Sequence, residues 1–166
     1  MFFLGAGFML LETKSITQFA LLWGATWMVA SLAIVSVLVM ALASTIVVSR
    51  RDIRRPWLVG VLLLVLLGAS YLLPIGRVAF GTRAAESLFY ALLYFSPIFC
   101  AGLLFGSAIK RSNSIARDYG TNLIGAMAGG VLEYLSLVTG YRALLLVVAA
   151  LYIAALIARR LQVGRA

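Results

Sequence analysis

The feature that most constrains this fold is a succession of apolar blocks, each long enough to cross a membrane, separated by short basic clusters. An α-helix needs about 20 apolar residues to cross a hydrocarbon core roughly 30 Å thick. Charged residues make up only 11% of the chain, whereas soluble domains hold about 25%. The mean hydropathy is +1.09. These properties exclude an ordinary soluble domain and predict an all-α, polytopic membrane protein that forms one helical bundle.

Six membrane spans follow from the positions of these blocks and of the residues that break helices. We expect helices at residues 2–23, 27–48, 57–73, 86–109, 118–139 and 141–158. Pro74 and Gly76 end the third span, which is short enough to be partly re-entrant, and residues 77–83 form a loop. Pro97 predicts a kink inside the fourth span.

The basic residues of the loops predict the orientation of the bundle, because cytoplasmic loops carry an excess of Lys and Arg. They gather after the second, fourth and sixth spans, where the chain has Arg50, Arg51, Arg54, Arg55, Lys110, Arg111, Arg117, Arg159, Arg160 and Arg165. Only Arg77, Arg83 and Arg142 follow the third and fifth spans. We therefore expect both termini in the cytoplasm, with Trp23 and Trp27 in an aromatic belt at the outer surface.

Several function classes are excluded or disfavoured by composition. The net charge of +9 sits at the ends of spans, with no basic stripe interleaved with aromatics, so we expect lipid contacts and no nucleic acid. Cys100 is the only cysteine and there is no histidine, which excludes metal sites built on His or Cys clusters of this chain alone. No catalytic motif is present: Gly5-x-Gly7 lacks the context of a dinucleotide fingerprint, and no cofactor is expected.

A polar stretch from Glu12 to Gln18 interrupts the first apolar block near its middle. A charged side chain at the bilayer midplane is costly and persists where it faces protein, water or an opposite charge. Glu12 and Lys14 lie two residues apart and point to nearly opposite faces of a helix. Ser15 shares the Glu12 side, and Gln18 shares the Lys14 side. At least one of the two charges therefore needs a partner from another helix or a water-filled crevice.

The fifth span offers such a partner. Its residues Asn122, Ala126, Gly129 and Glu133 follow each other at steps of four, three and four, so they form one narrow stripe. We hypothesise that the first and fifth helices pack together and that Lys14 pairs with Glu133. Glu12 would then be left to Ser, Thr or Tyr hydroxyls, or be protonated. Such a buried pair could also do no more than fix the helix register.

Two clusters of small residues indicate where helix backbones come close. The first is the run of small residues from Gly125 to Gly130, which includes Gly129. The second is formed by Gly102 and Gly106 in the fourth span, a weaker signal in a glycine-rich chain. Small residues at these spacings are typical of membrane helix interfaces because they let a neighbouring backbone approach. Arg142, after the fifth span, is interpreted as an interfacial anchor.

Residues 5–18 and 122–130, the latter continued through Glu133 and Tyr134 to Gly140, Tyr141 and Arg142, resemble a known family. They are similar to the membrane portion of bacterial spermidine-synthase-like fusion proteins, itself loosely similar to half of a major-facilitator transporter. The resemblance implies a bacterial inner-membrane location. In that family a separate soluble domain carries the aminopropyltransferase-like chemistry and its cofactor. We expect no such domain in this chain, so neither polyamine synthesis nor cofactor binding is expected from the resemblance. The resemblance marks Glu12, Lys14, Asn122 and Glu133 as family-type polar positions without assigning them a role.

Three functions stay open. The first is a non-catalytic membrane subunit that packs against partner membrane chains or itself, with a buried Lys–Glu site. The second is a half-size transporter of a small polar or cationic solute, whose dimer encloses Glu12, Lys14 and Glu133. The third is the membrane subunit of an enzyme whose catalytic domain is on another chain. A transporter predicts a wet cavity around the charges, whereas an assembly module predicts a dry one.

Overall fold

The computed structural model describes residues 1–73, 83–140 and 142–163, and these ranges form helices without any strand. The all-α prediction is therefore confirmed. Pro74, Gly76, residues 77–82, Tyr141 and Arg165 lie outside the described residues. The helices are α1 (Phe2–Trp23), α2 (Trp27–Arg50), α3 (Pro56–Leu72), α4 (Arg83–Ile109), α5 (Ile115–Glu133), α6 (Leu135–Thr139) and α7 (Ala143–Val163).

Three described segments are long and apolar enough to cross a membrane: Trp27–Arg50, Leu88–Ile109 and Ile115–Thr139. Pro56–Leu72 and Ala143–Arg159 are apolar but shorter. The chain is thus a helical bundle with helices that could span a membrane. That all six predicted spans cross the membrane stays a prediction.

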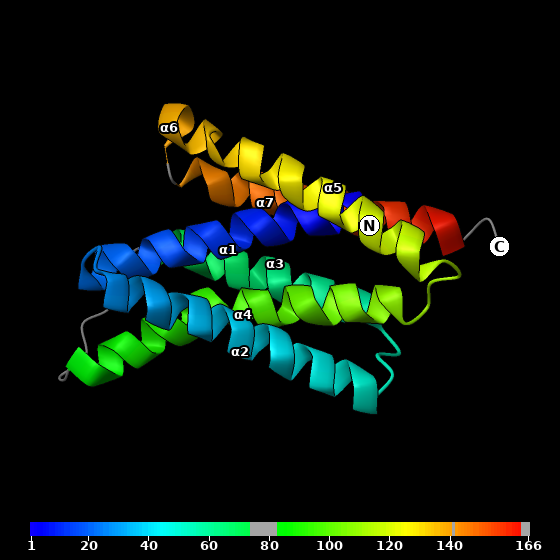
Figure 1. Ribbon diagram of the computed structural model, residues 1–166, viewed down its shortest axis with the longest axis horizontal. Coiled ribbons are helices and arrows are strands. Elements are labelled where there is room, and N and C mark those ends of the chain that lie inside the picture. Colours follow the sequence, from blue (N-terminus) through cyan, green and yellow to red (C-terminus); the bar gives the residue numbers. More distant parts are fainter. Residues whose placement is uncertain (74–82, 141, 164–166) are drawn as a thin grey trace.

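Local signals in the sequence explain where several helices begin and end. Gly24 adopts φ 91°, a left-handed conformation that glycine accepts without strain, and it ends α1. Thr26 then caps α2, its Oγ1 accepting a hydrogen bond from the Val29 N–H at 3.3 Å. Pro56 occupies the first turn of α3, where its missing N–H costs nothing. α4 continues through Pro97, and its axis is bent in Figure 1.

The fifth expected span is divided in two in the structure. α5 ends at Glu133, and α6 begins at Leu135, with Tyr134 between them. The Tyr134 N–H donates to the Val131 carbonyl at 3.2 Å, three residues back, so the regular i to i−4 ladder is broken there. The short α6 ends at Gly140, which adopts φ 82°. Residues 118–139 therefore do not form one continuous helix.

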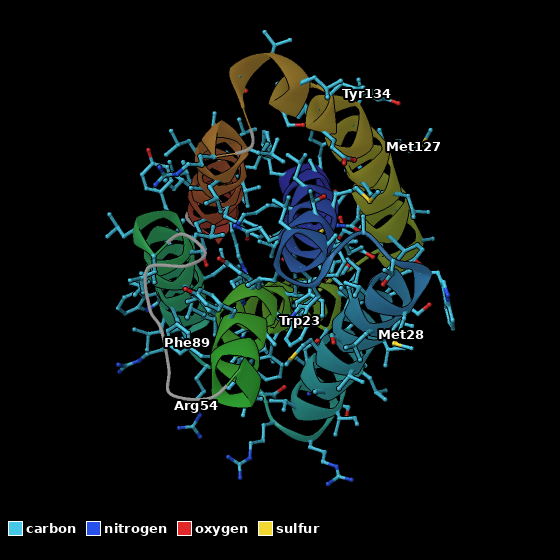
Figure 2. The ribbon with its side chains drawn as sticks, turned by 90° about the vertical axis from the view of Figure 1, so that its left-hand side faces the viewer. Trp23, Met28, Arg54, Phe89, Met127 and Tyr134 are labelled. Carbon is cyan, nitrogen blue, oxygen red and sulfur yellow. The ribbon has the colours of Figure 1, made fainter. Side chains whose placement is uncertain are left out.

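α1 lies in the middle of the bundle. Seen end-on in Figure 2, it is surrounded by α5, α7, α4 and α2, while α3 lies on the far side of α4 and α7. The core consists of apolar side chains that α1, α3, α4 and α7 bury against one another, among them Leu10, Leu11, Leu63, Ile98 and Val148. α5 differs from the other long helices because it packs almost entirely on α1.

The two basic clusters lie at the same end of the bundle. Figure 1 places the N-terminus, the C-terminal end of α7, the α2–α3 connection and the α4–α5 connection together at its right-hand side. We call this side the basic end, defined by residues 50–55 and 110–117. The α1–α2 turn and α6 lie at the opposite end. There, Arg142 Nη2 donates to the Tyr71 carbonyl at 3.0 Å and its guanidinium covers the Tyr71 ring.

Candidate functional site

α1 and α5 run in the same direction and meet backbone to backbone. A Cβ atom on Gly5 would collide with the Asn122 carbonyl, and one on Gly125 would collide with the carbonyl of Phe2. A Cβ atom on Gly129 would also collide with backbone atoms of Ala6, although less severely. Gly130, by contrast, has open space where a side chain would project. The structure thus places Gly125 and Gly129 in the helix contact and leaves Gly130 outside it.

Gly102 and Gly106 mark a second close contact, between α4 and α2. Gly102 lies against the Ser44 side chain, and Gly106 lies against Val48. The Ser44 hydroxyl donates to the Ala41 carbonyl at 2.7 Å, within its own helix. The two glycines therefore allow α2 to pack closely against α4.

Lys14 is buried on the side of α1 that faces α4. Its side chain is 3% exposed, and its Nζ lies 5.2 Å from the centre of the Tyr94 ring. Ser15 donates hydrogen bonds to the carbonyls of Leu11, at 2.8 Å, and Tyr94, at 3.0 Å. Gln18 follows one turn later, also buried. We call Lys14, Ser15, Gln18 and Tyr94 the α1–α4 polar cluster.

Two polar atoms of this cluster have no hydrogen-bond partner among the described residues. They are the Gln18 Oε1 and the Tyr94 hydroxyl, both with almost no accessible surface. Buried polar atoms are nearly always satisfied by protein or ordered water. The cluster is therefore polar and enclosed, and the described residues leave these two atoms of it unsatisfied.

The structure does not join Lys14 to Glu133. Within the described residues, the one ion pair closer than 4 Å is Lys110–Asp52. Lys14 lies nine residues after Gly5, about two and a half helical turns, so it points away from the side of α1 that touches α5. Glu133 instead lines a cavity of about 250 Å³ at the α5–α6 break, with Gly130, Tyr134, Ser136 and Leu137.

The bundle covers Glu12 only in part. It stands at the centre of α1 and is partly exposed. The nearby threonine hydroxyls do not donate hydrogen bonds to its carboxyl group. Thr13 donates to the Met9 carbonyl at 2.6 Å, and Thr17 donates to the Thr13 carbonyl at 2.9 Å. Among the described residues no side chain bonds to the Glu12 carboxyl group.

A cleft of about 600 Å³ opens between α2 and α5, with α1 and α4 as its back wall. Its polar lining residues are Ser44, Thr45, Ser49, Lys110, Tyr119 and Asn122; its apolar ones include Leu4, Phe8, Val48, Phe105 and Ile109. Leu4 and Phe8 precede Glu12 at steps of four, so Glu12 continues the same stripe of α1 one turn beyond the cleft. The cleft lies in the half of the bundle that contains the basic end.

The rim of the cleft at the basic end is built around Lys110. Its Nζ is 2.6 Å from Asp52 Oδ1 and donates to the Val48 carbonyl at 3.1 Å. The hydrogen bond from Lys110, together with its charge, lowers the pKa of the exposed Asp52 carboxyl group below its ordinary value. Arg111 Nη2 donates to the Ile53 carbonyl at 2.7 Å. These contacts tie the end of α4 to the α2–α3 connection.

Sequence reasoning missed the tyrosines of α4 and the hydroxyl residues of α2. Tyr90 and Tyr94 are four residues apart, and their rings stack with centres 5.9 Å apart. That spacing on an otherwise apolar helix is a signal that the sequence does offer. Thr45 and Ser49, likewise four apart near the end of a span, could have indicated the cleft. Which helix each pair faces could not be read from spacing.

Comparisons with protein-family models, with curated proteins and with solved structures found no match for this chain.

Proposed function

We propose that the protein is a non-catalytic integral membrane module that assembles with another membrane chain, or with itself, through the open face between α2 and α5. The observation that carries this proposal is the placement of Glu12. In our proposal α1 crosses the membrane with the other helices. A carboxyl group halfway along it, partly exposed and without a side-chain partner in the described residues, then needs a polar neighbour other than lipid tails. A second protein surface with a hydrogen-bond donor at that depth would cover it.

The exposure of α5 supports the same reading. Only 11% of the most apolar 18-residue window in Ile115–Thr139 is buried, and large apolar side chains such as Met127 and Tyr134 project outward from this segment (Figure 2). Lipid alone can cover those side chains, so they do not require a partner. The partly exposed Glu12 carboxyl group, however, needs a polar neighbour that lipid tails do not supply.

A half-size transporter is the second candidate, favoured by the cleft that reaches to within one turn of Glu12. Transport of a polar solute needs a wet cavity at the charged residues. The two cavities described above are lined by neither Glu12 nor Lys14. Lys14 is enclosed among the side chains of α1 and α4. We therefore rank assembly first.

Photocrosslinking in native membranes tests the assembly proposal. A photoreactive phenylalanine at Ile16, one turn beyond Glu12 on the same stripe and outside the cleft lining, should give an adduct of discrete protein mass, and the same residue at Leu62 on α3 should not. Glu12→Leu should lower the yield at position 16 about tenfold, the factor expected when a hydrogen bond to a charged group is lost. Glu12→Gln, which still accepts hydrogen bonds, should keep most of it.

The two candidates predict different chemistry at position 12. In the assembly, a cysteine at this position (with Cys100 replaced by Ser) should resist water-soluble maleimides in intact membranes. Rapid labelling of Glu12→Cys, combined with crosslinks at Ile16 to lipid only, would overturn the assembly proposal and favour a water-filled path. Equal crosslinking of the Glu12→Leu variant and the unmodified chain would also contradict it.

A further inference from the structure

We infer that the cleft between α2 and α5 is a binding site for one anionic phospholipid of the leaflet at the basic end. Its acyl chain would lie along the cleft, and its phosphate would sit at Lys110. The inference rests on the membrane embedding proposed above but not on the partner chain, and it concerns a different part of the same face.

The walls of the cleft suit a hydrocarbon chain better than a polar solute. Leu4, Phe8 and Phe105 form much of the lining. The hydroxyl groups that α2 contributes are already bonded within that helix. Ser44 and Thr45 donate to the Ala41 carbonyl at 2.7 and 2.9 Å, and Ser49 donates to the Ile46 carbonyl at 2.8 Å. A hydroxyl that satisfies a carbonyl of the preceding turn presents mainly its carbon atoms to the cleft.

The length of the cleft fits one leaflet. On α2 it runs from Ala41 to Ser49, and on α4 from Gly102 to Lys110. At 1.5 Å per residue either stretch spans roughly 12 Å. Half of a hydrocarbon core about 30 Å thick is roughly 15 Å. A single acyl chain entering from the basic end would therefore end near the middle of the bilayer, just short of Glu12.

The charged rim supplies a site for the headgroup. An ammonium group has three N–H donors. Lys110 uses two of them, for Asp52 and for the Val48 carbonyl, and no described residue takes the third. The Lys110 side chain is 43% exposed, so that donor is accessible. Arg50, Arg51, Arg54 and Arg111 at the same end add to the positive potential that attracts an anionic headgroup.

The neighbouring Asp52 makes the idea sharply testable. If the ion pair between Lys110 and Asp52 only fastens the two connections together, removing either side chain should have the same effect. If Lys110 binds a phosphate, the two removals should act in opposite directions. Lys110→Gln would lose the donor, whereas Asp52→Asn would free the ammonium group from its competing carboxylate.

Native mass spectrometry of the full chain in mild detergent provides the measurement. We expect one phosphatidylglycerol molecule to be retained in preference to phosphatidylcholine with the same acyl chains. Lys110→Gln should reduce that preference about fivefold, as expected for one basic residue near an anionic lipid surface. Asp52→Asn should maintain or increase it. Soluble glycerol phosphate in large excess should not displace the lipid, because it lacks the acyl chain.

A second pair of variants tests the cleft itself. Thr45→Trp combined with Ser49→Trp fills it from α2, where both residues are exposed, and should abolish tight retention of either lipid. Ile46→Trp, at the same depth but outside the lining, should leave retention unchanged. The inference would be overturned if filling the cleft left lipid retention unaffected, or if the unmodified chain retained no lipid. Equal losses of retention for Lys110→Gln and Asp52→Asn would also overturn it. Loss of assembly without loss of lipid would contradict the proposed function alone.

Discussion

At the scale of single residues, the contact between Lys110 and Asp52 shows how the connections at the basic end are held. Asp52 is 75% exposed and Lys110 is 43% exposed, so water screens their attraction. The ammonium group also bonds the Val48 carbonyl at the end of α2. Lys110 therefore holds two helix ends with one side chain, and the carboxylate helps to keep it in place.

The effect of Asp52 should depend on pH. Because its pKa is lowered in the folded chain, its contribution to stability is present above the unfolded pKa of about 3.9 and is lost as pH falls through the folded value. Asp52→Asn should therefore lower the midpoint of thermal unfolding slightly at pH 7 and leave it unchanged well below pH 3.9. In the Lys110→Gln background the same substitution should have no effect at either pH. A difference that grows in acid would contradict this.

Residue patterns in the sequence predicted some of the site but not its partners. The separation of Glu12 and Lys14 onto different faces of α1 follows from helix geometry alone. The partner of Lys14 does not, because the faces that two helices turn toward each other depend on how the whole bundle packs. Tyr94, which lies beside Lys14, is 80 residues away in the chain, and nothing in the local spacing connects the two.

At the scale of whole helices, the parallel pair α1 and α5 depends on close backbone approach. In a membrane the hydrophobic effect does not drive helices together, so tight packing of small residues must do so. Gly5, Gly125 and Gly129 provide that packing, each against a backbone carbonyl of the other helix. α5 has few other neighbours, so these glycines decide whether it stays attached.

Replacing Gly5 by Ala should therefore detach or shift α5. The added methyl group meets backbone atoms of Asn122 and Ala126, which cannot move aside as a side chain could. We expect a loss of about 1–3 kcal/mol in the free energy of unfolding, measured by denaturant titration in detergent. Gly130→Ala is the matched control, because its methyl group meets no atom and should stabilise α5 by about 0.4–1 kcal/mol. Similar losses for both variants would contradict the packing argument.

Helix limits were predicted well where the sequence carries explicit stop signals. The predicted span 2–23 coincides with α1, which ends at a glycine with positive φ. Pro56 likewise marks the start of α3. The break at Tyr134 carries no such signal, since Leu132, Tyr134 and Leu135 are all compatible with a continuous helix. The structure ends α5 there, and the apolar pattern alone could not indicate it.

At the scale of the whole molecule, the charge distribution and the arrangement of the helices agree. Every second connection returns to the basic end, which collects residues 50–55 and 110–117, while the α1–α2 turn at the opposite end has no charged residue. The excess of Lys and Arg in cytoplasmic loops of membrane proteins predicts that the basic end of this bundle faces the cytoplasm. The sequence predicted this orientation from its loops, and the structure adds that both basic connections lie beside the N-terminus.

The orientation can be tested with single cysteines. Cys100 is buried, so Cys100→Ser gives a background without a reactive thiol. Asn113→Cys, in the exposed α4–α5 connection, should react with an impermeant maleimide only after the cells are permeabilised. Ala25→Cys, in the exposed α1–α2 turn, should react in intact cells. Reversed labelling would place the basic end outside, and equal labelling of both sites in intact cells would mean that the intervening helices do not separate two compartments.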